Sequence, residues 1–182
     1  MKATGIVRRI DELGRVVIPK EIRRTMRIRE GDPLEIYTDR EGEVIFKKYS
    51  PIGELTTFAT LYAETLSKTC DMMVLVCDRD AVIAAGGLPK KDYMDKRISL
   101  QAEEVMVGRK QFSYRQDATN FEVTAEVTGF FVSCMMPIIV NGDIHGCVAS
   151  VFPAANKETH ATTEIESKLI LTAASFLGAQ LD

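Results

Sequence analysis

The chain has 182 residues, and its 23 Lys and Arg against 26 Asp and Glu leave a net charge of -3. With 46% hydrophobic and 27% charged residues it has the composition of an ordinary globular protein, which excludes disordered and fibrous chains. No apolar run approaches the roughly 18 to 20 residues of a membrane-spanning helix, and no signal-peptide pattern follows Met1, so we expect a cytoplasmic protein without a membrane partner.

The charge is divided unevenly along the chain. Residues 1–30 hold nine basic and four acidic side chains, and residues 1–50 together carry +3. The remaining 132 residues therefore carry -6. A basic segment that binds a polyanion would explain this asymmetry, and so would an ordinary solvated surface. Charge alone leaves both interpretations open.

The first fifty residues show short strand patterns separated by turns. Thr4–Ile10 and Arg15–Ile18 are expected to form two strands, with a turn at Asp11–Gly14 between them. Pro19 suits the first position of a helix that continues to Met26, and Ile22 and Met26 are expected on its buried face. Two further strands are expected at 33–38 and 43–48, joined by a hairpin turn at 39–42.

These short elements bury too little apolar surface for a domain that stands alone. We therefore expect an intertwined homodimer with a shared core of Val16, Ile18, Leu34, Ile36, Val44 and Phe46. Two such modules would bring two charges of +3 onto one body. Guanidinium groups at one end of the sheet would then suit phosphates and guanine edges, which they bind through two parallel hydrogen bonds. The arginines expected to converge there are Arg8, Arg9, Arg15, Arg23 and Arg24.

The same residues resemble a known family. Gly5–Arg8, Leu13–Lys20, Glu21–Arg24 and Gly31–Ile36 are similar to the corresponding stretches of the AbrB-type swapped-hairpin family of bacterial transition-state regulators. The resemblance implies an interlocked homodimer that binds double-stranded DNA through four arginines. The four motif positions are filled here by Arg8, Arg15, Arg23 and Arg24, and Arg9 is added as a fifth basic candidate. The competing interpretation is that these arginines only keep a small β dimer soluble.

The pattern changes at Pro51, where we place a boundary between domains of residues 1–50 and 51–182. Apolar spacing predicts an amphipathic helix over 52–66 and another over 163–181. The second helix has one stripe with Ile170, Leu177 and Leu181 and another with Ile165, Leu169 and Phe176. Between the helices we expect strands at 72–77, 81–85, 111–115, 121–127, 129–140 and 144–152, and short helices at 90–94 and 100–107.

An antiparallel sheet with a helix at each end is the α+β layout of GAF and PAS sensory domains. It also matches two-domain members of the resembling family from endospore-forming bacteria, whose second domain is GAF-like. That resemblance implies a nucleoid-associated activator and repressor of sporulation genes in the forespore. The apolar helix faces either cover their own sheet or pair two domains into a homotetramer, and the sequence leaves both open. A small-molecule effector would lie near 86–92 and 117–120, where no residue identifies it.

No motif for nucleotide binding, serine hydrolysis or zinc proteolysis is present, so we expect no catalytic residue, cofactor or metal. Cys77, Cys134 and Cys147 lie in apolar strand patterns and are expected to be buried, whereas His145 is expected to be exposed or capped rather than catalytic. A thiol enzyme is one alternative, because some GAF folds reduce methionine sulfoxide with cysteines. An antitoxin is another, although it requires a disordered toxin-wrapping tail, which the apolar periodicity of 52–181 disfavours.

Overall fold

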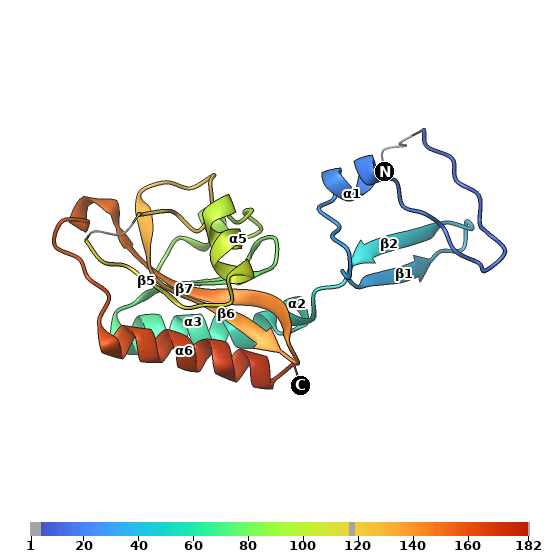
Figure 1. The fold of residues 1–182 in the computed structure, drawn as a ribbon. Helices are drawn as coiled ribbons and strands as arrows, with labels where there is room; N and C mark the ends of the chain where they lie inside the picture. Colours follow the sequence, from blue (N-terminus) through green and yellow to red (C-terminus); the bar gives the residue numbers. More distant parts are fainter. Residues whose placement is uncertain (1–4, 117–118, 182) are drawn as a thin grey trace. The chain divides into compact units, whose positions relative to one another are not determined.

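The computed structural model describes residues 5–116 and 119–181. The chain divides into two compact units, Met1–Tyr49 (unit 1) and Ser50–Asp182 (unit 2), and each is described by itself (Figure 1). Three positions used in the predictions, namely Thr4 of the first strand and residues 117 and 118 of the effector loop, lie outside the described residues. In the part of the chain that is described, no helix is long and apolar enough to cross a membrane.

Unit 1 consists of one helix and one hairpin. The helix α1 (Lys20–Thr25) begins directly after Pro19, as predicted. Strands β1 (Leu34–Thr38) and β2 (Val44–Lys48) pair antiparallel, with Leu34 opposite Lys48 and Thr38 opposite Val44. These three elements confirm the predicted helix and the second pair of strands.

The first two predicted strands are absent from the single chain, and that prediction was wrong for residues 5–10 and 15–18. Their turn does form, since the Asp11 N–H donates to the Arg15 carbonyl over 3.0 Å and the Gly14 N–H donates to the Asp11 carbonyl over 2.9 Å. Beyond this turn the chain makes no ladder. A strand exists only where another strand accepts its hydrogen bonds, and the single chain offers none to these residues.

Unit 1 has almost no interior. Among residues 5–49 only Pro19 is buried. Met26, predicted on a buried face, is 57% exposed, because the helix ends at Thr25 and nothing packs over the residue that follows it. Of the six predicted core residues, Ile18 and Leu34 are half-buried and the others are exposed, namely Val16, Ile36, Val44 and Phe46. The single chain therefore does not form the predicted core.

Unit 2 is built on an antiparallel sheet of strand order β4-β3-β7-β6-β5. The two longest strands form a hairpin at the tight turn predicted from Asn141-Gly142, and this hairpin supplies the centre of the sheet. The strands are β3 (Met73–Asp78), β4 (Val82–Gly86), β5 (Phe112–Ser113), β6 (Phe130–Val140) and β7 (Asp143–Pro153). Strands were predicted at all five places.

Helices cover one face of this sheet and a loop-rich layer covers the other. Figure 1 shows α3 (Thr56–Cys70) and α6 (Glu164–Ala179) side by side against one face, with α5 (Leu100–Val107) on the opposite side. Successive side chains of β3 point to opposite faces of the sheet and so belong to two separate cores. Val74 and Val76 pack toward the two helices, while Leu75 and Cys77 pack toward α5. Two short helices complete the unit, α2 (Pro51–Glu54) and α4 (Lys90–Tyr93), followed late in the chain by the 3-10 turn Ala154–Asn156.

Two predictions in unit 2 need correction. The helix expected over 52–66 is divided at Leu55 into α2 and α3, although Ile52, Ala59 and Leu66 are buried as their spacing predicted. The strand expected over 121–127 is a loop with one isolated bridge, from Thr124 to Ile98. Phe121 and Val123 are buried there, but their carbonyls accept from residues on two different segments, so no continuous ladder forms.

A glycine sets how closely a helix approaches the sheet. A Cβ atom added to Gly86 at the end of β4 would lie 2.1 Å from the carbonyl oxygen of Ala63 in α3. The backbone of α3 therefore packs directly against the backbone of β4. This approach supports the core in which Ala59, Ala63 and Leu66 are buried.

Candidate nucleic-acid interface

All five candidate arginines are exposed, and they come from two segments of unit 1. Arg8, Arg9 and Arg15 lie in the irregular segment 5–18, on either side of the Asp11–Gly14 turn. Arg23 and Arg24 lie in the last turn of α1. Their guanidinium groups are thus available to a polyanion, in keeping with the +3 charge of residues 1–50.

The turn at Asp11 holds Arg15 through both its backbone and its side chain. The Asp11 Oδ1 accepts from the backbone N–H of Leu13 at 3.0 Å and of Arg15 at 2.8 Å. The Asp11 Oδ2 accepts from the Arg15 Nε at 2.8 Å, which also makes an ion pair. The pKa of Asp11 is lowered, first by the hydrogen bond from the Arg15 backbone and then by that from its guanidinium. Asp11 is therefore an ionised partner of Arg15 at neutral pH.

The helical pair has a different environment. Neither Arg23 nor Arg24 makes a side-chain hydrogen bond or ion pair with any described residue of the chain. The helix is short, and two features stabilise its first turn. Pro19 has its φ fixed by its ring, and the Arg23 N–H donates to the Pro19 carbonyl over 2.9 Å. Both arginines lie near the negative end of the helix dipole, where a positive charge is favoured.

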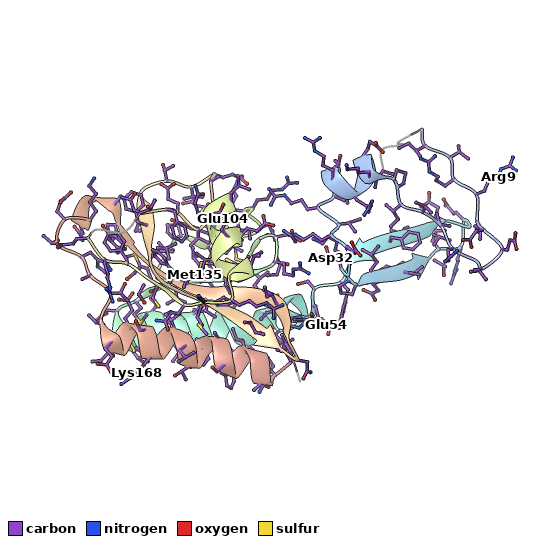
Figure 2. The ribbon with its side chains drawn as sticks, viewed as in Figure 1. Arg9, Asp32, Glu54, Glu104, Met135 and Lys168 are labelled. Atoms are coloured by element: carbon purple, nitrogen blue, oxygen red, sulfur yellow. The ribbon has the colours of Figure 1, made fainter. Side chains whose placement is uncertain are left out.

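Within one chain Arg9 lies apart from the helix that holds Arg23 and Arg24 (Figure 1 and Figure 2). Figure 2 labels Arg9 on the side of unit 1 that is opposite α1, whose position Figure 1 marks in the same view. The five arginines were predicted to converge at one end of a sheet in a homodimer, and that stays a prediction. The sequence predicts Asp11 only as part of a turn. Its bond to the Arg15 side chain has no separate signal in the sequence, because the turn itself needs only one of the two carboxylate oxygens.

A second polar cluster in unit 1 has a structural role. The Lys48 ammonium donates to the Arg27 carbonyl at 3.0 Å and lies 3.6 Å from the carboxylate of Asp32. Asp32, whose side chain is 2% exposed, accepts from the backbone N–H of Arg29 at 2.8 Å. This cluster joins the loop after α1 to β2. It explains why Lys48, although basic, is engaged inside the unit.

The thiols and histidines of unit 2 do not form an accessible reactive group. Cys77, Cys134 and Cys147 are buried as predicted, whereas Cys70 is exposed. The pKa of the Cys77 thiol is raised well above its ordinary value, first by its hydrogen bond with Cys147 and then by burial. Within the described residues no cluster of His, Cys, Asp and Glu is suited to a metal ion. His145 lies inside β7, as expected, and is half-buried.

The other histidine attaches the segment before α6 to the sheet. The Nε2 of His160 lies 2.7 Å from the hydroxyl of Ser133, and its ring stacks on Phe152 at 3.8 Å and 13°. Burial lowers the pKa of His160. Ser133 is wholly buried in β6, and His160 is half-buried over it. The geometry of this pair is that of a packing contact.

Comparisons with known structures establish the fold of unit 2. The GAF domain of a phosphoenolpyruvate-protein phosphotransferase from Coxiella burnetii is 19% identical, with a TM-score of 0.51 over 70% of this chain and 82% of that chain. A type II free methionine-R-sulfoxide reductase from Thermoplasma acidophilum is 9% identical, with a TM-score of 0.51 over 71% and 94%. At these identities the likeness concerns the fold alone. Unit 2 has the GAF fold, as its order of elements predicted, and the α+β class is confirmed.

Comparisons of sequence identify the family. Family profiles match residues 54–182 as the C-terminal part of stage V sporulation protein T, a transcription factor, and residues 7–53 as a MazE-type antidote-toxin recognition region of bacterial antitoxins. Transition state regulatory protein AbrB of Bacillus subtilis is 47% identical over 88 residues, which are 48% of this chain and 75% of that protein. Stage V sporulation protein T of the same organism is 50% identical over 183 aligned residues, covering 100% of this chain and 99% of that protein. The chain therefore belongs to the stage V sporulation protein T family of transcription factors.

Proposed function

We propose that this protein is a bacterial transcription regulator that binds double-stranded DNA through the arginines of unit 1 and activates or represses sporulation genes. The observation that carries the proposal is the 50% identity to stage V sporulation protein T over the whole chain. It is supported by the exposure of Arg8, Arg9, Arg15, Arg23 and Arg24. Phosphate contacts position such a protein, while arginine contacts and DNA shape select the site. The regulator acts in the cytoplasm on the nucleoid, and in the forespore, without catalysis.

The proposal includes a homodimer through unit 1. Apolar side chains that a folded domain would bury are left in solvent, among them Val7 at 83%, Val17 at 71% and Ile36 at 60% exposed. A second copy that supplies partner strands to residues 5–18 would cover these side chains and accept the ladder hydrogen bonds that one chain leaves unmade. Dimerisation also brings two sets of arginines onto one body.

Unit 2 supports the assembly of two dimers into a homotetramer. One stripe of α6 covers its own sheet, since Ile170 and Leu177 are wholly buried. The other stripe is exposed at Ile165 (72%) and Phe176 (38%), while its Leu169 packs against the core of the unit. The neighbouring helix α3 adds Phe58, which is 49% exposed. The buried stripe covers its own sheet, and the exposed side chains support the proposal that two such domains pair. A small-molecule effector, if the GAF fold binds one, alters DNA affinity only by favouring one arrangement of the assembly.

The test is a set of arginine substitutions measured by fluorescence anisotropy with labelled duplex DNA. Arg15→Ala and Arg23→Ala are each expected to weaken binding by about 10- to 150-fold, since charge-assisted contacts contribute about 1.5 to 3 kcal/mol. Arg40→Ala is the matched control, because Arg40 is an exposed arginine of the other turn in unit 1. The affinity of the unaltered protein is expected to fall steeply with salt as counterions are released. A flat salt dependence would overturn the proposal.

The alternative function is an antitoxin, and the match of residues 7–53 to the MazE profile keeps it in view. A toxin-neutralising tail is expected to be disordered until it wraps its partner. Residues 50–182 instead form a compact unit with two cores of its own. Co-purification of a small toxin with the full chain would favour the antitoxin.

A further inference from the structure

Two turns of unit 1 share one design. The first runs Asp11-Glu12-Leu13-Gly14-Arg15 and the second runs Asp39-Arg40-Glu41-Gly42-Glu43. In both, the N–H of the aspartate donates to the carbonyl of the fifth residue, at 3.0 Å in the first and 3.2 Å in the second. In both, the aspartate Oδ1 accepts from the third residue at 3.0 Å and from the fifth at 2.8 Å. The glycines have φ of +75° and +85°, a region that other residues rarely adopt.

The turns differ in what the second carboxylate oxygen does. Of the carboxylate, closing the turn needs only Oδ1, and this is the oxygen with which the Asp39 side chain takes part in its turn. The Oδ2 of Asp11 accepts in addition from the Nε of Arg15 at 2.8 Å. Arg15 is 69% exposed in its side chain, so this bond does not bury the guanidinium. The extra interaction is therefore separable from the turn that carries it.

A carboxylate beside a DNA-binding arginine has an electrostatic cost, because it repels phosphates. It also fixes a long side chain that otherwise loses rotamer freedom on binding. Engagement through Nε leaves the two terminal amino groups of the guanidinium free, and these are the groups that bind a guanine edge or a phosphate with two parallel bonds. The lowered pKa of Asp11 keeps the carboxylate ionised in this role.

From this geometry we infer that Asp11 is a positioning residue, which holds the Arg15 guanidinium by its Nε so that its terminal amino groups are presented to DNA in one orientation. The inference rests on the proposed function, since it assigns Asp11 to the same DNA-binding site. Its contribution is to the choice of DNA sequence. The negative charge of Asp11 is expected to lower the affinity for DNA of every sequence, because it repels phosphates.

The variant Asp11→Asn separates the two roles of the carboxylate. The asparagine oxygen still accepts the two backbone N–H groups, while its amide nitrogen cannot accept from the Arg15 Nε. The full chain is used, with a duplex that the unaltered protein selects from random-sequence DNA and a shuffled duplex of the same composition. For Asp11→Asn we expect an unchanged melting temperature, about a fivefold loss of affinity for the selected duplex, and equal or higher affinity for the shuffled one.

Two further variants make the test specific. Asp39→Asn makes the same change of charge in the same kind of turn without an arginine partner, and it should leave the ratio of the two affinities unchanged. In an Arg15→Ala background, Asp11→Asn should cause no further loss, because its partner is absent. The inference is overturned if Asp11→Asn keeps the ratio, if Asp39→Asn lowers it equally, or if the losses from Asp11→Asn and Arg15→Ala add. If the unaltered protein enriches no duplex, the proposed function itself fails.

Discussion

The two units of this chain differ in how far each completes its own fold. Unit 2 buries two mainly apolar cores on the two faces of one sheet, and every strand of that sheet has a partner within the unit. Unit 1 buries only Pro19 among residues 5–49 and leaves a strand-like segment without any ladder. The difference shows that a compact unit of a chain need not have a hydrophobic core of its own. A unit can hold well-formed turns, a helix and a hairpin and still require a second chain for its interior.

The largest expected effect comes from a charge placed in the exposed apolar surface of unit 1. Ile36→Asp is expected to abolish self-association through unit 1, since an unpaired charge buried at the new interface costs about 3 to 5 kcal/mol. DNA binding should be lost with it, while unit 2 keeps its melting transition. Sedimentation velocity and calorimetry of the full chain measure both. Val107→Asp, at an apolar residue of α5 that is 66% exposed, is the control and should change neither. Unchanged association of Ile36→Asp would show that unit 1 is complete as a single chain.

A smaller effect is expected where unit 2 is most tightly packed. Gly86→Ala introduces a methyl group 2.1 Å from the Ala63 carbonyl, and moving the α3 backbone is expected to cost about 2 kcal/mol of unfolding free energy. Gly178→Ala is the control, because its added Cβ would meet side chains at 3.6 Å, an ordinary contact, inside α6. Its helix propensity should leave stability equal or raise it by about 0.5 kcal/mol. Urea unfolding of unit 2 distinguishes the two, and equal stability of both variants would contradict the close approach.

A weaker effect on unit 2 depends on pH. Because burial lowers the pKa of His160, the unfolded chain takes up a proton at a higher pH than the folded chain does. The stability that neutral His160 contributes is complete above its ordinary pKa of 6.5 and is lost as the pH falls from there toward the folded pKa. We expect the melting temperature to fall between pH 7.5 and pH 5.5, and His160→Gln to reduce that fall. His145→Gln is the control and should retain it.

The smallest perturbation tests whether the interior of unit 2 is closed. Iodoacetamide is expected to modify the native protein at Cys70 alone and to modify all four cysteines after denaturation, because the other three thiols are buried. Intact-mass spectrometry counts the adducts. Rapid native modification of Cys134 or Cys147 would revive the thiol-enzyme alternative and would mean that unit 2 opens to solvent.

The contrast between the units also explains which parts of the fold the sequence predicts. The sheet strands of unit 2 are predictable because their partners lie in the same chain and, in all but the two-residue strand β5, their apolar runs are long. The segment 121–127 is not, since Phe121 and Val123 are buried as a strand would bury them, while their hydrogen bonds go to two different neighbours. The apolar pattern of a sequence predicts which side chains are buried, but it does not predict which backbone groups form hydrogen bonds with each other.

In unit 1 the same limit applies across chains. Residues 5–10 and 15–18 have the apolar content of strands, and no strand of their own chain pairs with them. The candidate arginines were predictable from charge and from resemblance to a family. The role of Asp11 was not, because a turn motif accounts for one carboxylate oxygen and hides the other, which contacts Arg15. Only the geometry separates the two oxygens.

The Asp11 turn has a consequence for the order of events during folding. It is closed by bonds within five consecutive residues, and it forms in a chain that has no ladder beside it. Loops of this size close in about 10 to 100 ns, far faster than two chains meet. When two chains meet, the Asp11 turn of each would thus already be formed, and only the segments on either side of it would remain to be ordered into strands. Association then becomes a zipping reaction that starts from a local nucleus, and its rate should respond to the turn as much as to the interface.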